Sequence, residues 1–331
     1  MRESIKVVQM GCGPIGCSIA KLAASKQHIE VVGAIDLAHA GRSLGELAGS
    51  ELLQSIIISD DARAVLQSTN PDIVTHATGS TVSGIFPQLE MLLKAGVNVV
   101  STCEELSYPF YHNPTLSEEL DFLAKANDKT VLATGVNPGF LMDAWPAFMT
   151  GICNEVESIK SVRIQDAAFR RLQFQQKIGA GLSVEEFKQR VEQGTIRHMG
   201  LPESAAMIAA AMGWPLEKLI ETIEPVVAEN EVSSMDITVC ADAAAGVKQI
   251  VRGYVDGVER LTLDFRAFIG AENPHDTVTI KGSPSFDVTV KGGVHGDFAT
   301  ASMIVNAVPK VVGAEAGLKT MKDIAMVVLA K

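Results

Sequence analysis

This chain of 331 residues has few cysteines, few aromatic residues and no long apolar run. Its five cysteines are odd in number and scattered, with no C-x-x-C pair and no zinc-ligand spacing, so we expect free thiols, no metal site and a reducing, cytoplasmic location. No signal peptide and no membrane-spanning stretch are predicted, and therefore no membrane partner. The net charge of −11 and the lack of a Lys/Arg block argue against nucleic acid as a partner.

Residues 5–36 are the strongest functional signal, because they read as a strand, a glycine-rich turn, a helix and a second strand. The turn is Gly11-Cys12-Gly13-Pro14-Ile15-Gly16, and Asp36 follows about 20 residues after its last glycine. This motif, placed between a strand and a helix and followed by an acid, is typical of dinucleotide-binding proteins. An ordinary βαβ unit whose glycines only make a turn is the alternative, and the register of all four parts favours dinucleotide binding.

Each part of the turn has a separate expected role. Gly11 allows the tight turn, Gly13 lets the backbone approach a pyrophosphate, and Gly16 lets the helix pack closely on the strand. The helix begins at Pro14 and Ile15, where unpaired N–H groups and the helix dipole can hold phosphates. We therefore predict that all five residues contact the cofactor.

Two charged residues bear on which dinucleotide is bound. Asp36 can accept hydrogen bonds from both hydroxyls of the adenosine ribose, and its charge would repel a 2′-phosphate. Arg42 follows closely and could pair with that phosphate. NAD is therefore the predicted cofactor, and NADP stays open.

Strands and helices alternate through the first half of the chain, which predicts a Rossmann-type, doubly wound parallel sheet in an α/β fold. Ligands bind beyond the carboxyl ends of the strands in such sheets, so four loops are expected to face one crevice. These loops are residues 11–16, 78–80, 103–105 and 136–140.

From about residue 155 the pattern changes to alternating strands with short turns, which predicts a second, α+β domain with a mostly antiparallel sheet. The Asp256-Gly257 pair signals a hairpin. The expected strands are residues 157–164, 232–240, 246–254, 259–269, 276–281 and 287–290, and the expected helices are 184–193, 202–212 and 216–223.

A last helix, residues 297–312, should return to cover the first domain, and Pro309 should kink it or end it early. We therefore expect a dinucleotide-binding domain of residues 1–145, completed by residues 297–331. Residues 146–296 are expected to form the second domain and to bind substrate.

Polar residues at the strand ends are candidates for chemistry in the first domain. Glu104 and Glu105 follow one strand, and either could be a general base or a solvated loop acid. Asn137 and Phe140 follow another, where the nicotinamide amide and ring would lie, although Asn-Pro-Gly is also a common turn signal. Thr78-Gly79 ends a third strand and is expected to contact the cofactor.

The second domain offers weaker candidates for substrate binding. His198 could line a pocket or could simply be a polar residue at a helix start. Arg163 and Gln165 end a strand that should form the pocket floor. Arg170 and Arg171 could bind a substrate carboxylate, or could form a solvated basic turn.

Five segments resemble 2,4-diaminopentanoate dehydrogenase and the related native amine dehydrogenases, which share the N-terminal fold of dihydrodipicolinate reductase. The segments are residues 101–106 (Ser-Thr-Cys-Glu-Glu-Leu), 134–143 (Thr-Gly-Val-Asn-Pro-Gly-Phe-Leu-Met-Asp), 200–204, 293–300 and 306–309. The resemblance implies reversible oxidative deamination of an amine, with NAD(P)+ as hydride acceptor and Glu104 as general base. The substrate implied is 2,4-diaminopentanoate or a related amine.

The same resemblance implies a homodimer joined through the second sheet. The chain lacks the His-His helix and the Lys-x-Asp-x-Pro-Ser-Gly segment expected of dihydrodipicolinate reductase itself, so that activity is not expected. Two alternatives stay open. One is a dehydrogenase of another small substrate on the same fold, and the other is a dinucleotide-binding sensor without turnover.

Overall fold

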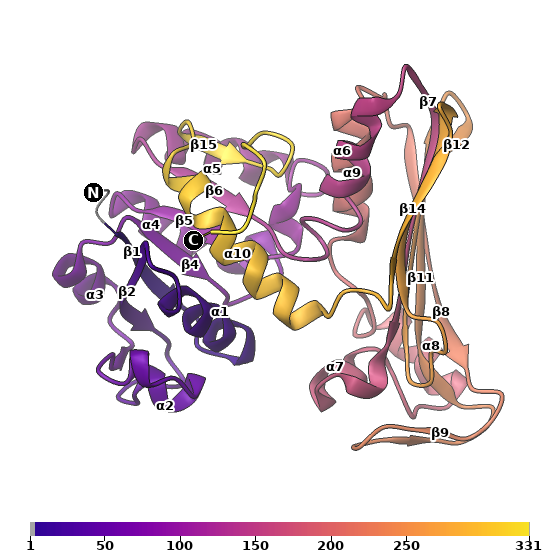
Figure 1. Ribbon diagram of the computed structural model, residues 1–331, viewed down its shortest axis with the longest axis horizontal. Helices are drawn as coiled ribbons and strands as arrows, with labels where there is room; N and C mark the ends of the chain where they lie inside the picture. The colour runs from indigo at the N-terminus through magenta and orange to yellow at the C-terminus, as the bar shows by residue number, and fades with distance from the viewer. Residues whose placement is uncertain (1–3, 331) are drawn as a thin grey trace. The chain divides into compact units, whose positions relative to one another are not determined.

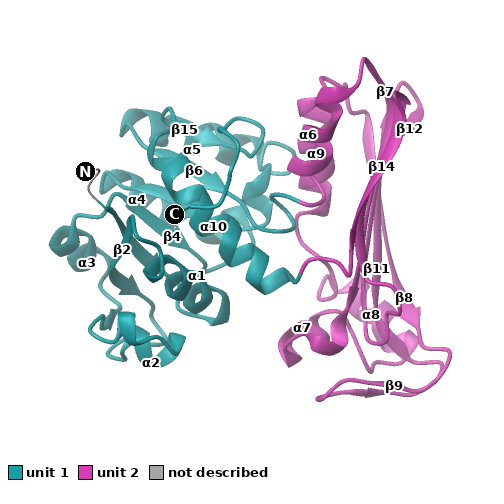
Figure 2. Cartoon of the chain, viewed as in Figure 1, with its two compact units in different colours: residues 1–140, 295–331 teal, residues 141–294 magenta. Residues whose placement is uncertain are grey.

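The computed structural model describes residues 4–330 and divides the chain into two compact units (Figure 2). Unit 1 consists of residues 1–140 and 295–331, and unit 2 of residues 141–294. Residues 1–3 and 331 lie outside the described residues. The first predicted domain was expected to begin at residue 1 and to end at residue 331, so these two limits lie outside the described residues as well. Within residues 4–330, no helix is long and apolar enough to cross a membrane.

Unit 1 is built on a seven-stranded sheet whose neighbouring strands are all parallel, in the order β15-β6-β5-β4-β1-β2-β3 (Figure 1). The strands are β1 (Ile5–Met10), β2 (Ile29–Ile35), β3 (Ile58–Ser59), β4 (Ile73–His76), β5 (Asn98–Ser101), β6 (Thr130–Ala133) and β15 (Gly317–Lys319). The helices are α1 (Pro14–Ala24), α2 (Leu44–Ala48), α3 (Ala62–Thr69), α4 (Val82–Lys94), α5 (Pro114–Ala126), α10 (Gly296–Val312) and the short 3₁₀ turns η1 (Glu51–Leu53) and η2 (Glu105–Ser107).

Helices cover both faces of this sheet. Side chains of α1 and α10, such as Ile19 and Val305, pack against one face. Side chains of α4 and α5, such as Leu89 and Leu120, pack against the other. The central strands are therefore apolar on both faces, as parallel strands of this kind usually are. This arrangement confirms the predicted doubly wound architecture.

The chain returns to unit 1 through α10, which packs against α1. The expectation that Pro309 would end this helix early is wrong, because the helix continues to Val312. Pro309 lies near the C-terminal end, so its missing N–H removes one bond, and the burial of Val305, Val308 and Val311 holds the last turns in place.

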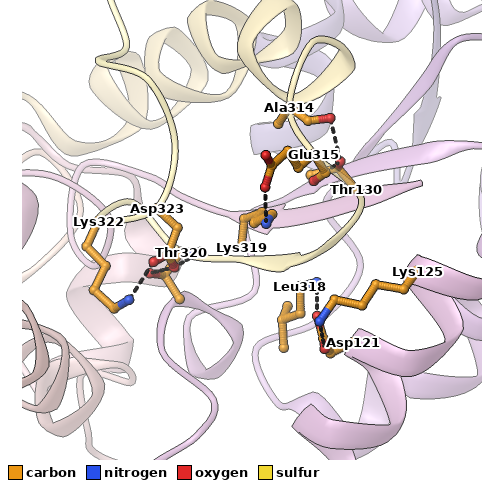
Figure 3. Close-up of polar contacts among 10 residues, drawn as sticks. All are labelled: Asp121, Lys125, Thr130, Ala314, Glu315, Leu318, Lys319, Thr320, Lys322 and Asp323. Carbon is orange, nitrogen blue, oxygen red and sulfur yellow. Dashed lines mark hydrogen bonds and ion pairs between the residues drawn. The ribbon is translucent and has the colours of Figure 1, made fainter. Parts of the chain in front are cut away.

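The segment after α10 is held to unit 1 by backbone and side-chain hydrogen bonds (Figure 3). The Leu318 amide donates to Asp121 of α5 at 3.0 Å, and the Thr130 hydroxyl donates to the Glu315 carbonyl at 3.0 Å. Asp323 accepts from both the amide and the hydroxyl of Thr320. These bonds fix β15 beside β6 as the edge strand.

Unit 2 contains a six-stranded sheet in the order β14-β13-β7-β12-β11-β8. Only β7 and β12 are parallel, which confirms a mixed, mostly antiparallel sheet. Its strands are β7 (Glu155–Asp166), β8 (Lys218–Val227), β11 (Ala244–Val255), β12 (Val258–Phe268), β13 (His275–Ser283) and β14 (Phe286–Lys291). The other elements are α6 (Ala144–Met149), η3 (Thr150–Ile152), η4 (Ala167–Phe169), α7 (Leu172–Lys177), α8 (Val184–Glu192), α9 (Leu201–Ala211) and the two-stranded ribbon β9 (Val232–Ser233) and β10 (Thr238–Val239).

Two predictions for unit 2 are wrong. Residues 216–223 were expected to be helical, but they begin β8, which pairs along its length with β11. The spacing of the leucines and isoleucines in this segment is compatible with a helix or with a strand. Backbone hydrogen bonding to β11 favours the strand. Residues 232–240 form the short ribbon of β9 and β10 and not one long strand. The predicted Asp256-Gly257 hairpin joins β11 and β12, with both residues at positive φ (52° and 72°).

Candidate functional site

The glycine-rich turn lies between β1 and α1, at the carboxyl edge of the parallel sheet. Gly11 has a φ of +87°, and a Cβ on it would lie 2.4 Å from the Ala77 carbonyl oxygen. A Cβ on Gly16 would lie 1.8 Å from the Gly11 carbonyl oxygen. Neither position has room for any side chain, because the obstacle in each case is backbone.

Gly13 differs from these two glycines, because a Cβ on it would meet nothing within 4 Å. It is the N-cap of α1 and provides no side-chain cap, so the first amides of the helix, from Ile15 onward, have no capping side chain. Pro14 occupies the first helical position, where no N–H is needed. The open space over Gly13 and the uncapped start of an 11-residue helix fit a pyrophosphate group.

Asp36 follows β2 and is held in place by three backbone amides. One carboxylate oxygen accepts from the Cys12 amide at 2.6 Å, and the other accepts from Ala38 at 2.8 Å and His39 at 3.1 Å. These bonds orient the carboxylate beside the glycine-rich turn. The oxygen that accepts only from Cys12 keeps a further lone pair, which a ribose hydroxyl could use.

The electrostatics around the turn combine Asp36 and Arg42. Burial raises the pKa of the Cys12 thiol to about 12, with the negative charge of Asp36 as a second cause. The pKa of Cys17 is also raised by burial and by Asp36, and is lowered by Arg42. Arg42 is half-exposed, and its nearest acid is Glu46 at 3.7 Å. Asp36 and Arg42 thus both lie close enough to the turn for their charges to act on Cys17.

Thr78 and Gly79 directly follow β4. The Thr78 hydroxyl donates to the Gln88 side-chain oxygen at 2.5 Å and lies 2.9 Å from Nε2 of His76. His76 is fully buried, and Ser101 contacts its other ring nitrogen at 2.9 Å. Desolvation lowers the pKa of His76 to about 4. His76 is therefore a neutral core histidine that supports the loop.

The structure separates the two adjacent glutamates. Glu105 accepts a hydrogen bond from the Val82 amide at 2.8 Å, and it also accepts one from the Asn113 side chain at 3.5 Å. It therefore caps the start of α4. Glu104 is half-buried, and its carboxylate has no hydrogen-bond or ion-pair partner among residues 4–330. Of these two glutamates, Glu104 is therefore the one whose carboxylate makes no hydrogen bond or ion pair within residues 4–330.

Asn137 and Phe140 lie in the loop after β6. Both polar atoms of the Asn137 amide are buried and lack a hydrogen-bond partner within residues 4–330. Buried amides rarely go unpaired, so this side chain fits a polar ligand group such as a carboxamide. Phe140 is 37% exposed. The Thr300 hydroxyl of α10 accepts from the Val136 amide at 3.3 Å and so holds the loop.

Unit 2 carries a row of large side chains across four of its strands. Asp276 of β13 pairs with Arg163 of β7, which pairs with Phe265 of β12, which pairs with Gln249 of β11. All four are buried. Arg163 forms an ion pair with Asp276 and donates to the Val294 carbonyl at 2.8 Å. The terminal nitrogens of this predicted substrate-binding residue therefore already have protein partners.

His198 lies over this row and is held by Gln249. The Gln249 side chain accepts from the His198 amide at 2.7 Å and donates to the His198 carbonyl at 2.9 Å. The ring contacts that of Phe265 in a tilted arrangement, with a centroid distance of 4.2 Å. Nδ1 lies 2.9 Å from the Met199 carbonyl, which can only accept, so the proton is on Nδ1 and Nε2 carries the lone pair.

Burial and positive charge keep this imidazole neutral. Its pKa is lowered to about 3, first by desolvation and then by the charges of Lys177, Arg163 and Arg170. Arg170 is itself buried, donates to the side chain of the predicted pocket residue Gln165 at 2.8 Å, and lies 4.1 Å from the Phe174 ring centroid. The solvated-turn alternative is therefore wrong for Arg170, whereas Arg171 is exposed.

The structure thus brings together two groups of predicted residues, one in each unit. The first group follows strands at the carboxyl edge of the parallel sheet and comprises Gly11, Gly13, Pro14, Ile15, Gly16, Asp36, Arg42, Thr78, Gly79, Glu104, Asn137 and Phe140. The second group, Arg163, Gln165 and His198, lies on one face of the sheet of unit 2. Gln249 and Asp276 were not identified from the sequence. The signal that could have found them is a polar residue at a strand position whose neighbours on the same face are apolar. No group of side chains that could hold a metal ion occurs in the described part of the chain.

Two family models match the chain. The model described as "2,4-diaminopentanoate dehydrogenase C-terminal domain" matches residues 140–330. The model described as "Dihydrodipicolinate reductase, N-terminus" matches residues 5–103. The second match identifies the parallel sheet of unit 1 as an NAD(P)-binding fold.

Relatives of known name match over nearly the whole chain. The 2,4-diaminopentanoate dehydrogenase of Acetoanaerobium sticklandii is 34% identical, covering 97% of this chain and 94% of that protein. The structure of an amine dehydrogenase from Mycobacterium smegmatis has a TM-score of 0.86 at 24% identity, covering 98% and 97%. Dipicolinate-bound dihydrodipicolinate reductase from Paenisporosarcina sp. TG-14 has a TM-score of 0.51 at 15% identity, covering 97% and 100%. The two structural likenesses concern the fold.

Proposed function

This chain belongs to the 2,4-diaminopentanoate dehydrogenase family, as its motifs predicted, and from that premise we propose that it oxidises an amine with NAD(P)+. In the proposed reaction, an amine, NAD(P)+ and water give a ketone, ammonia, NAD(P)H and a proton, and the reaction is reversible. The substrate we favour is 2,4-diaminopentanoate or a closely related amine, because the relative of that name is similar from end to end.

The observation that carries this proposal is the difference between Glu104 and Glu105. Glu105 caps α4, whereas the Glu104 carboxylate has no partner among residues 4–330 and follows β5 at the ligand-binding edge of the sheet. Glu104 would take a proton from the substrate ammonium, release it to solvent, and then take a proton from the attacking water. Its negative charge would also stabilise the cationic iminium, which an alcohol substrate would not form.

The residues around the glycine-rich turn fit the cofactor. Bound NAD(P)+ would supply the hydride acceptor. Gly13 and the start of α1 would hold the pyrophosphate, and Asp36 would hold the ribose hydroxyls. The unpartnered Asn137 amide would bind the nicotinamide carboxamide, with Phe140 beside the ring. Asp36 favours NAD, whereas Arg42 gives a 2′-phosphate a partner, so NADP is the second choice.

We also infer a homodimer in a reducing compartment. The face of the second sheet opposite to Arg163 and Phe265 carries half-buried apolar side chains such as Val162, Ile164 and Phe268. A second copy would bury this face. The five cysteines are all free, which supports a cytoplasmic location.

The test is reduction of NAD+ and NADP+ at alkaline pH with 2,4-diaminopentanoate, alkylamines and matched alcohols. The wild type should oxidise amines and not alcohols, and prefer NAD+. Glu104→Gln should lower kcat by about 10²- to 10⁴-fold, the usual contribution of a general base, and leave the Kd for NAD+ unchanged.

Glu105→Gln is the matched control. It should keep kcat within a few fold and lower the free energy of unfolding by about 1 kcal/mol, because a neutral amide is a weaker cap for α4. Equal kcat in the wild type and Glu104→Gln would rule out the role given to Glu104. Oxidation of alcohols alone would rule out the reaction.

A further inference from the structure

An open pocket of about 410 Å³ lies in unit 1, beside the edge strand β15. It is lined by the loop that precedes α5, by α5 itself and by residues 318–323. A Cβ on Gly317, the first residue of β15, would lie 2.7 Å from the Asp121 carboxylate and 3.2 Å from Cε of Lys125, so α5 approaches the side of this strand. In the strand order β15 is four positions from β1, about 19 Å at the usual spacing of strands. The pocket is therefore separate from the glycine-rich turn.

The charged side chains of this pocket carry an excess of positive charge (Figure 3). They are three lysines and two acids: Lys125, Lys319, Lys322, Asp121 and Asp323. Asp121 accepts a hydrogen bond from Lys125 at 2.6 Å, and Asp323 accepts one from Lys322. Backbone amides and a hydroxyl of neighbouring residues also donate to these two carboxylates. One positive charge is therefore in excess, in a chain whose net charge is −11.

Lys319 supplies this excess charge. Its ammonium lies 3.9 Å from the carboxylate of Glu315, whose side chain is 95% exposed. Exposed ion pairs of this kind contribute at most about 1 kcal/mol. An ammonium has three N–H donors, and that of Lys319 makes no hydrogen bond within residues 4–330. A ligand anion could pair with Lys319 without displacing a strong protein partner.

Two aromatic side chains line the same pocket. The rings of Tyr108 and Phe110 lie edge to face, with a centroid distance of 5.3 Å. Burial raises the pKa of the Tyr108 phenol, so the hydroxyl keeps its proton at neutral pH. This hydroxyl has no hydrogen-bond partner in the described part of the chain. The pocket therefore offers apolar ring surface and a neutral donor next to its lysines.

We propose that this pocket binds a small phosphate compound that carries a flat ring, such as a nucleoside monophosphate or an aryl phosphate. The lysines would bind the phosphate as charged donors, and Tyr108 and Phe110 would contact the ring of the ligand. The volume of about 410 Å³ lies within the usual range of small-molecule sites, about 300–1,000 Å³. This inference does not depend on the proposed reaction.

The alternative is that the lysines only prevent the edge strand from pairing with another chain, which is a common use of lysine at the edge of a sheet. That role accounts for Lys319 on β15. It does not account for the two rings and the unpartnered phenol that line the pocket beside it.

The test is calorimetry on the full-length protein with AMP and with phenyl phosphate. Excess NAD+ is present, so that a probe cannot register by binding at the glycine-rich turn. Inorganic phosphate lacks the ring and adenosine lacks the anion, and these two are the reference ligands. At least one aromatic phosphate should bind at least 10-fold more tightly than both reference ligands. The tighter of the two probes identifies the source of the ligand as a nucleotide or as an aryl phosphate.

Variants of the pocket should then weaken binding of that probe. Lys319→Met should raise its Kd about 10- to 100-fold, the effect of a lost charge-assisted hydrogen bond, whereas Lys319→Arg should keep most of the affinity. Phe110→Ala should raise the Kd about 10-fold through lost stacking. Lys94→Met is the matched control, because Lys94 also pairs with a glutamate four residues before it, Glu90, but lies on α4 outside the pocket. Its Kd should equal that of the wild type.

Three results would overturn the assignment. These are no binding of either aromatic phosphate at millimolar concentration, equal Kd values for the wild type and Lys319→Met, or inorganic phosphate that binds as tightly as the aromatic probes. Thermal unfolding checks that each variant is folded, and Phe110→Leu replaces Phe110→Ala if the latter is not. Failure of the proposed amine oxidation would leave these results unchanged, because they record binding and not turnover.

Discussion

The sheets of the two units bury polar side chains of different kinds. In unit 1 the buried polar groups are neutral: the Thr75 hydroxyl donates to Gln9 at 2.8 Å, and Gln9 donates to the Gly11 carbonyl at 2.9 Å. In unit 2 they include a charged pair, because Arg163 and Asp276 form an ion pair with both side chains buried. The first network supports the glycine-rich turn, whose proposed ligand groups are backbone amides, and the second lies beneath the His198 side chain.

This difference teaches how each region can bind a ligand. Backbone amides at a helix start bind an anion without bringing a side-chain charge into the protein. Charged side chains in a sheet must be desolvated first, and they are tolerated only when partners surround them. Unit 1 should therefore be sensitive to added volume near the turn, and unit 2 to the loss of a charge.

The largest effect should come from breaking the ion pair. Asp276→Asn should lower the free energy of unfolding by about 3–5 kcal/mol, because Arg163 would stay buried with its charge unmatched. Thr75→Val, which removes a neutral hydrogen bond in unit 1, should cost only about 1 kcal/mol. Urea denaturation monitored by circular dichroism gives both values. Equal losses would remove the distinction between the two networks.

A smaller effect on stability should separate two glycines of the turn. Gly16→Ala should lower the free energy of unfolding by about 3 kcal/mol and abolish NAD+ binding, because its Cβ would meet the Gly11 carbonyl. Gly13→Ala should leave stability nearly unchanged, since nothing lies within 4 Å, and should still weaken NAD+ binding. Thermal unfolding and titration with NAD+ measure these effects. Full NAD+ affinity in Gly13→Ala would argue against a pyrophosphate over this position.

The smallest effect concerns the two neutral histidines, one in each unit. The pKa is lowered to about 4 for His76 and to about 3 for His198 in the folded protein. In the unfolded chain both histidines have the ordinary histidine pKa of about 6.5, so as pH falls the unfolded chain takes up protons before the folded protein does. Their stabilising contribution is complete above that pH and is lost as pH falls toward the folded pKa values. For fully buried His76 the loss between about pH 7 and pH 5 should be about 2 kcal/mol.

Urea denaturation at the two pH values measures this loss, and His76→Gln should remove it from the pH dependence. His198→Gln should remove less, because the ring is only half-buried and solvent screens its interactions. A larger effect for His198 than for His76 would contradict the burial order of the two rings.

Much of unit 1 could be predicted from the sequence, because its signals are local. The turn of residues 11–16 and Asp36 belong to one short βαβ unit. Within it, Gly11 has a positive φ, and neither Gly11 nor Gly16 has room for a Cβ. The strand β8 could not be predicted, because residues 216–223 suit a helix or a strand, and only pairing with β11 decides between them.

The sequence by itself determined the dinucleotide-binding turn, the acid beside it, and the strands that carry the ligand-binding loops. These follow from steric limits on a few neighbouring residues. The tertiary structure decided which glutamate is available, because Glu105 is used only where α4 begins beside it in space. It also decided the setting of His198, since Arg163, Gln249 and Phe265 come from three strands that only register brings together. Local sterics can be read along a chain, whereas burial and pairing between distant segments exist only once the sheet has formed.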